Sequence, residues 1–245
     1  MVNTLPVFFS EPFVLSRDNE DSAYVKLPEN FDFAAGTNAV PLTIIEFELA
    51  CRYYPIVFAA GEECSAMSVL GLELGKNLFV NTQGAWLSSS YIPAYVRKFP
   101  FVFLQSENEE KYTLCIEASY RSDEVSGLPV FSDDEPSQQI TVALEFCKKF
   151  QAAWDSTREL GEFLQKNDLL IERRADIEMQ TGEKISLDGF SVIDREKFEE
   201  MYQQDNVLND ISPQHMSAIH SHFVSMNNWQ SLVDLNASII DPTIN

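Results

Sequence analysis

The sequence predicts an α+β fold: an antiparallel meander sheet with a buried N-terminal helix, one long central helix, then a hairpin and C-terminal helices. Three observations carry this prediction. Short branched and aromatic runs alternate with turn residues before residue 121, apolar residues recur about every 3.6 positions over 137–166, and residues 184–193 alternate between apolar and polar side chains. We expect a single domain over residues 1–245, and sub-units 1–121 and 137–235 if it divides at all.

The first 120 residues are expected to hold most of the strands. Pro41 is placed as a first helical residue, where its missing N–H costs nothing, and a helix over 42–53 follows that is apolar on most sides and therefore buried. Residues 1–35 are expected to form short strands or an arm on the core. Further strands are expected at 56–60, 67–74, 78–80, 86–87, 101–104 and 112–118, with turns at 75–77 and 81–84, one or two helical turns at 91–98, and a loop at 106–111.

The second half is expected to be mainly helical. Residues 122–137 have the composition of a connection, and the helix over 137–166 would be roughly 40 Å long at ~1.5 Å per residue, with a bend near Gly161. A hairpin of 169–179 and 184–193 turns at Thr181-Gly182, and Asp194 caps a short helix that runs to 203. The last helical region is placed at 213–235 and a frayed tail at 236–245.

Composition and charge exclude several classes of protein. The 245 residues include 38 acidic and 17 basic side chains, a net charge of −21, which opposes nucleic-acid binding. This charge fits a basic protein or peptide partner as well as it fits solubility in a saline cytoplasm. The apolar fraction of 45% excludes wholesale disorder, and no apolar window is long enough for a membrane span.

The N-terminus lacks the basic region of a secretory signal, so we expect a cytoplasmic protein. The four cysteines, at positions 51, 64, 115 and 147, are expected to be reduced core residues.

The sequence contains no recognisable catalytic or metal motif. The three histidines, His215, His220 and His222, lack the i, i+4 spacing of metal pairs on helices. A nucleophile elbow and a glycine-rich phosphate loop are also absent. We therefore expect no catalytic residues, no metal and no cofactor.

The densest candidate site lies in residues 75–101. Trp86, Tyr91 and Tyr95 surround Arg97 and Lys98 there, and aromatic rings beside an arginine can bind a planar or anionic ligand. The same composition also forms packed structural corners in which the arginine bonds backbone carbonyls, so both interpretations stay open.

Two carboxylates interrupt the helix that is expected to be buried. Glu46 and Glu48 would each need a partner there, which Arg52 or Arg97 could supply. A structural ion pair and a role in the site both remain open for Glu46.

The same stretch resembles the SapC family, bacterial proteins named from a surface-layer gene cluster. The resemblance is carried by Val-Pro-Leu at 40–42, Tyr-Pro-Ile-Val-Phe at 54–58, Asn-Leu-Phe-Val at 77–80, Gly-Ala-Trp at 84–86, Tyr-Ile-Pro-Ala-Tyr-Val-Arg-Lys-Phe-Pro-Phe at 91–101 and, more loosely, a phrase that begins at His222. The resemblance gives no catalytic residues that could be carried over to this chain. It does imply a part in surface-layer export or assembly, or an accessory role beside outer-membrane receptors and halogenase-like or cupin-like enzymes.

These observations lead to one main functional hypothesis. The chain is expected to be a non-catalytic cytoplasmic accessory or binding protein of the SapC type, linked to surface-layer, uptake or peptide-modification systems, and a homodimer is compatible with it. The expected ligand-binding residues are Asn77, Trp86, Tyr91, Tyr95, Arg97, Glu46 and His222. The alternatives are an enzyme acting on a peptide or small molecule, which would use His222 with a carboxylate such as Glu46, and an exported surface-layer subunit.

Overall fold

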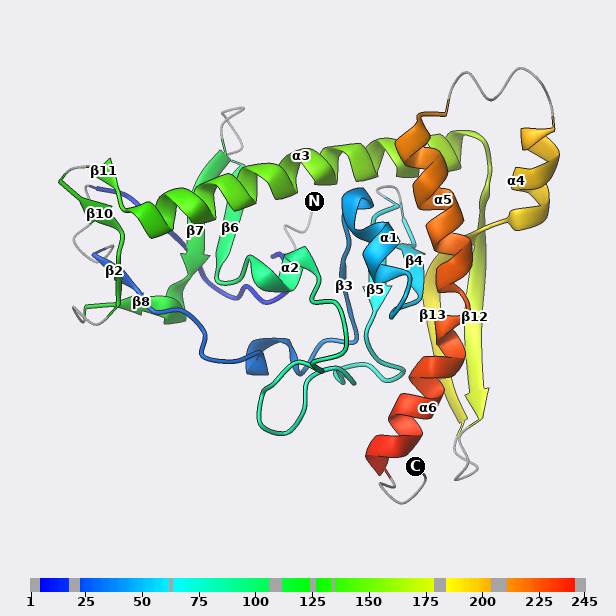
Figure 1. Ribbon diagram of the computed structural model, residues 1–245, viewed down its shortest axis with the longest axis horizontal. Helices are drawn as coiled ribbons and strands as arrows, with labels where there is room; N and C mark the ends of the chain where they lie inside the picture. The colour runs from blue at the N-terminus through cyan, green and yellow to red at the C-terminus, as the bar shows by residue number, and fades with distance from the viewer. Residues whose placement is uncertain are drawn as a thin grey trace.

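The computed structural model describes residues 5–17, 23–61, 64–105, 112–123, 127–133, 135–178, 184–203 and 211–240. The long helix α3 (Gln138–Lys166) runs along one side of the molecule and connects two β-structured ends (Figure 1). The fold is α+β with antiparallel sheets, as the sequence predicts.

The larger sheet has five strands in the order β12-β13-β4-β5-β3, and every neighbouring pair is antiparallel. Its strands are β3 (Ala39–Pro41), β4 (Ile56–Ala59), β5 (Ala66–Val69), β12 (Leu170–Glu178) and β13 (Lys184–Ile193). The predicted hairpin is therefore confirmed, with its turn at 181–182 outside the described residues. Because Phe190 of β13 pairs with Ala59 of β4, one sheet combines strands from both expected sub-units.

The other end of the molecule holds smaller sheets. The strands β1 (Pro12–Val14), β6 (Phe101–Gln105) and β7 (Tyr112–Glu117) pair in the order β1-β7-β6, which confirms the predicted pair; the loop at 106–111 lies outside the described residues. The expectation of a plain connection over 122–137 is wrong. That stretch contributes two-residue strands. β8 (Arg121–Ser122) and β9 (Leu128–Pro129) both pair with the N-terminal β2 (Tyr24–Val25), and β10 (Phe131–Ser132) pairs with β11 (Glu135–Pro136).

The first helical region begins later than expected. Pro41 ends β3 and lies opposite Met67, at a sheet edge where its missing N–H is tolerated. Thr43 is the N-cap of a 3-10 turn, η3 (Ile44–Glu46), which continues into α1 (Phe47–Ala50). Two predicted strands were also too long: β5 ends at Val69, and residues 78–80 contribute only the isolated bridge between Val80 and Trp86.

Capping side chains begin two of the remaining helices, and one of these caps, Asp194, was predicted. Ser137 caps α3 through the Ile140 amide, and Asp194 caps α4 (Arg195–Tyr202) through the Lys197 amide. The last region divides into α5 (Pro213–Ser225) and α6 (Asn228–Ile240); α2 (Ala94–Arg97), η2 (Asp32–Ala34) and η4 (Ala118–Tyr120) are single turns. A frayed tail from residue 236 is wrong, because α6 continues to Ile240 and packs the Asn236 side chain into the interior; residues 241–245 lie outside the described part.

The helix α3 continues through Gly161 without interruption. A Cβ atom at this position would lie 3.0 Å from the Cys64 carbonyl oxygen, so the glycine is explained by the close approach of another chain segment. None of the helices in the described ranges has the length and apolar character to span a membrane.

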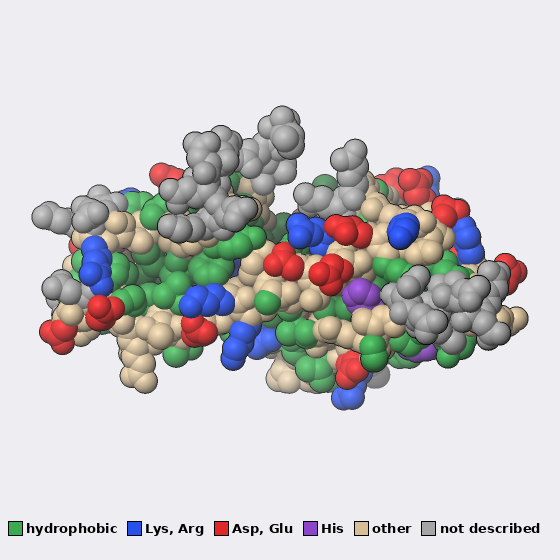
Figure 2. Space-filling view, turned by 90° about the horizontal axis from the view of Figure 1, so that it is seen from above, with side chains coloured by type: hydrophobic (Ala, Val, Ile, Leu, Met, Phe, Trp, Pro, Cys, Tyr) green, Lys and Arg blue, Asp and Glu red, His purple; other side chains and the backbone are tan. Residues whose placement is uncertain are grey.

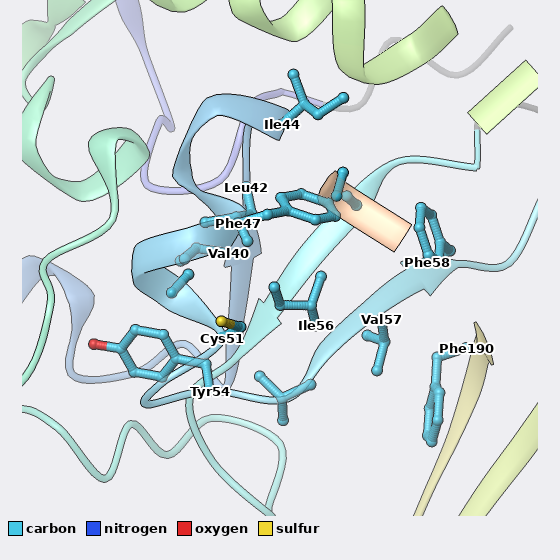
Figure 3. Packing of buried hydrophobic residues seen from close by; sticks show 14 of the residues in the cluster. Val40, Leu42, Ile44, Phe47, Cys51, Tyr54, Ile56, Val57, Phe58 and Phe190 are labelled. Atoms are coloured by element: carbon cyan, nitrogen blue, oxygen red, sulfur yellow. The ribbon is translucent and has the colours of Figure 1, made fainter. Parts of the chain in front are cut away.

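The largest core cluster fills the space between the five-stranded sheet, α1 and α5. Figure 3 shows Phe47, Tyr54, Ile56 and Phe58 packed there. A second cluster, which includes Ile116, Ile140 and Cys147, lies between β6, β7 and the first half of α3. All four cysteines are buried and free, as expected.

Candidate functional site

Glu46 is buried and fully hydrogen-bonded. Its Oε2 accepts from the Thr43 amide (3.0 Å) and the Thr43 hydroxyl (2.6 Å), and its Oε1 accepts from the Tyr91 hydroxyl (3.0 Å) and the Ala94 amide (2.6 Å). The expected ion pair with Arg52 or Arg97 is wrong. The carboxylate is instead satisfied by four neutral donors, which join η3 to the N-terminus of α2.

Arg97 reaches this network through Tyr91. Its Nη2 donates to the Tyr91 hydroxyl (3.0 Å) and its Nε donates to the Ile92 carbonyl (3.0 Å). Burial, followed by the Glu46 charge, raises the pKa of Tyr91 to about 12, so the phenol stays protonated. The Tyr54 hydroxyl donates to the Tyr91 carbonyl, which fixes Tyr91 from the other side. The predicted structural corner, with Arg97 on a backbone carbonyl, is therefore present.

The Arg97 side chain is exposed, unlike its neighbours on α2. Its guanidinium carbon lies 5.6 Å from the centroid of the Tyr91 ring and 5.4 Å from that of Phe146 on α3. No carboxylate of the described residues pairs with Arg97, and no group in the same ranges accepts a hydrogen bond from its Nη1. Two hydrogen bonds thus hold the Arg97 side chain in place, and its Nη1 remains available as a donor to a ligand.

Lys98 follows Arg97 but is turned into the interior, with an exposed fraction of 6%. Its Nζ lies 4.3 Å from the Tyr95 ring centroid, 5.3 Å from that of Phe9 and 5.4 Å from that of Phe150. Within the described ranges it makes no ion pair and no hydrogen bond. Burial lowers the pKa of Lys98 to about 8, and the Cys147 thiol offsets this only in part.

Arg97 and Lys98 both line an open cavity of about 750 Å³, which we call the α3 cavity. It lies between the first half of α3, the residues around α2 and the segment 27–33. Its wall is mostly apolar and includes the rings of Phe31, Phe33, Phe99, Phe101 and Phe146; its charged residues are Arg97, Lys98 and Glu29. Figure 2 shows hydrophobic side chains gathered over the half of the molecule that holds this part of α3.

The other predicted residues lie behind the cavity or far from it. Trp86 is buried and packs on Phe31, with 5.6 Å between ring centroids. The Tyr95 hydroxyl donates to the Val7 carbonyl (2.9 Å). Asn77 donates to the Ala34 carbonyl (3.1 Å) and accepts from the Phe79 amide (2.9 Å), which makes it a structural bridge.

His222 has a structural environment on α5. It is completely buried, and its Nε2 accepts from the Ile193 amide (3.1 Å). Burial lowers the pKa of His222 to about 4, so the ring is neutral and ties α5 to β13. No described polar group bonds its Nδ1. Glu46 accepts its hydrogen bonds from Thr43, Tyr91 and Ala94, so no hydrogen bond joins it to His222, its partner in the enzyme alternative.

The described residues contain no cluster of His, Cys, Asp and Glu that could hold a metal ion. Only part of the α3 cavity could be predicted from the sequence, namely Arg97. Phe146 and Cys147 have the spacing of an ordinary core stripe on a helix, and Lys98 resembles a solvent-exposed neighbour of Arg97. The available signal was the step of about 100° between consecutive helical residues, which allows Lys98 to face the interior while Arg97 faces solvent.

A scan against protein-family models matches the SapC family over residues 7–232. No curated protein and no solved structure matches the chain.

Proposed function

Because the chain belongs to the SapC family, we propose that it is a non-catalytic cytoplasmic binding protein that holds an apolar ligand in the α3 cavity. It would serve as an accessory to a surface-layer, uptake or peptide-modification system, the roles that the family resemblance implies.

The observation that carries this proposal is the α3 cavity itself. Its volume of about 750 Å³ falls within the range of roughly 300–1,000 Å³ that is typical of small-molecule sites. Most of its wall is aromatic or aliphatic, and a few polar groups converge on it, which is the usual design of such a site.

The network behind the cavity supports the same proposal. Glu46 and Tyr91 hold Arg97 in one position, so the cavity presents a fixed polar group before any ligand arrives. A rigid site loses less conformational entropy on binding than a flexible one.

The enzyme alternative has less support. His222 and Glu46 each have hydrogen bonds that a structural role explains, and neither lines the α3 cavity.

The net charge of −21 also supports a basic protein partner on the surface outside the cavity.

Filling the cavity tests the proposal. We expect the fluorescence of an anilinonaphthalene sulfonate probe to rise saturably with one site per chain, and Ala143→Phe to weaken binding at least about tenfold by occupying the cavity. Val142→Trp, at an exposed position on the rim, provides a second variant should Ala143→Phe lower the melting temperature.

The matched control is Val224→Phe, because Val224 is exposed on α5 and does not line the cavity. Equal probe binding by the wild type and both cavity variants would show that the cavity is not the binding site.

A further inference from the structure

We propose that the ligand of the α3 cavity is an apolar monocarboxylic acid whose carboxylate binds Arg97 and Lys98. This inference rests on the proposed function and adds the chemical class of the ligand.

Arg97 has the geometry of a prepared carboxylate receptor. Its Nε and Nη2 are each fixed by one hydrogen bond of 3.0 Å, and the ring of Phe146 supports the guanidinium plane from the cavity wall. These contacts leave Nη1 free to donate, as far as the described residues extend. The two N–H groups of Nη1 can donate charge-assisted hydrogen bonds to a carboxylate, which are about twice as strong as hydrogen bonds between neutral groups.

Lys98 adds a second positive charge without a counterion. The chain has 38 acidic side chains, yet none in its described part approaches Lys98; only three aromatic rings and the Cys147 thiol do. Other lysines do have acidic partners: Lys148, which is exposed, lies 2.8 Å from Glu145, and Lys76, which is half-buried, lies 3.0 Å from Glu73. A buried, unpaired cation is costly to keep, so a cavity that keeps one is prepared for an anion.

The balance of charges sets the class of ligand. Arg97 and Lys98 against Glu29 leave the cavity with a surplus of one positive charge, which matches a monoanion and opposes an amine. The rings of Phe31, Phe33, Phe99 and Phe101 leave the rest of the ligand an apolar surface. Burial of that surface would supply most of the affinity, at about 25 cal/mol per Å², and the carboxylate would set the orientation.

The test compares two molecules that differ only in the head group. Isothermal titration calorimetry with octanoate and with octan-1-ol is expected to give about tenfold tighter binding of octanoate, a difference of about 1.4 kcal/mol. Arg97→Met and Lys98→Met should each remove most of that preference, because each weakens the binding of octanoate more than that of octan-1-ol.

The control is Arg158→Met. Arg158 is an exposed arginine on α3 that pairs with Asp155 (3.7 Å) and Glu162 (3.9 Å) and does not line the cavity, so its loss should leave both affinities unchanged.

Two results would overturn the inference. Equal affinity for octanoate and octan-1-ol would mean that the cavity binds apolar molecules without reading a carboxylate, and the proposed function would survive. If neither molecule binds and cavity filling has no effect on the probe, both the inference and the proposed function fail.

Discussion

Two buried charged residues lie at opposite ends of the short helix α2, and they differ in whether their charged groups have hydrogen-bond partners. At its N-terminus Glu46 accepts hydrogen bonds from two backbone amides and two hydroxyls. Directly after its C-terminus Lys98 has no hydrogen-bond acceptor among the described residues, only the faces of aromatic rings and a thiol. Both side chains are less than a tenth exposed.

The difference separates a structural group from a functional one. A satisfied buried carboxylate fixes the position of the segments that it joins, here η3 and the residues 91–94. A buried ammonium without a counterion opposes folding, because its attraction to aromatic faces offsets only part of the cost of burying the charge. Proteins retain such groups where binding needs them, which is the recurrent conflict between stability and function.

Glu46→Ala should produce the larger effect. The substitution leaves the Thr43 amide, the Tyr91 hydroxyl and the Ala94 amide buried without acceptors, so we expect the free energy of unfolding in urea to fall by about 3–5 kcal/mol.

Glu48→Ala is the matched control for this change. Glu48 is exposed and accepts one hydrogen bond from Ser217, so its loss should cost no more than about 1 kcal/mol. Similar losses for the two variants would contradict the assignment of Glu46 as the organising group.

Lys98→Met should have a smaller effect of opposite sign. Below a pH of about 8 both the folded and the unfolded chain carry the Lys98 proton, and folding must bury the full charge. Between about 8 and 10.5 only the unfolded chain is protonated, so this cost decreases as the pH rises. The cost at pH 7 is about 3 kcal/mol, and the cation–π contacts already act in its favour.

We therefore expect Lys98→Met to unfold at higher urea concentration than the wild type at pH 7, by about 1–3 kcal/mol, and to lose most of this advantage by pH 10. Lys149→Met, on an exposed position of α3, should change little at either pH. A destabilised Lys98→Met would mean that the ammonium is a structural group like Glu46.

The sequence was sufficient for the elements whose patterns are long. The 29 residues of α3 and the two strands of the hairpin repeat their periods often enough to be recognised alone. The two-residue strands β8 to β11 were missed because they are too short to show a period, and β8 and β9 also depend on the distant partner β2.

For the site, the sequence led to Arg97 and Tyr91 but gave the wrong partner for Glu46. An ion pair is the simplest expectation for a buried carboxylate, whereas the backbone amide of Ala94 and the hydroxyls of Thr43 and Tyr91 become available only once the chain folds. The opposite wall of the cavity includes Phe146 and Cys147 of α3, which lie 49 and 50 positions after Arg97 in the sequence, so only the fold brings them into place.

The most direct test of this account is the pKa of Lys98, measured by NMR on the ¹³Cε resonance of labelled protein with and without octanoate. Two titratable groups lie around the amine, Cys147 and Tyr95. Burial raises the pKa of Cys147 to about 11, and it also raises the pKa of Tyr95. Glu29 and Arg97 line the same cavity. We predict a pKa of about 8 in the free protein and a higher value when octanoate is bound. A value near 10.5 in the free protein, unchanged by octanoate, would contradict it.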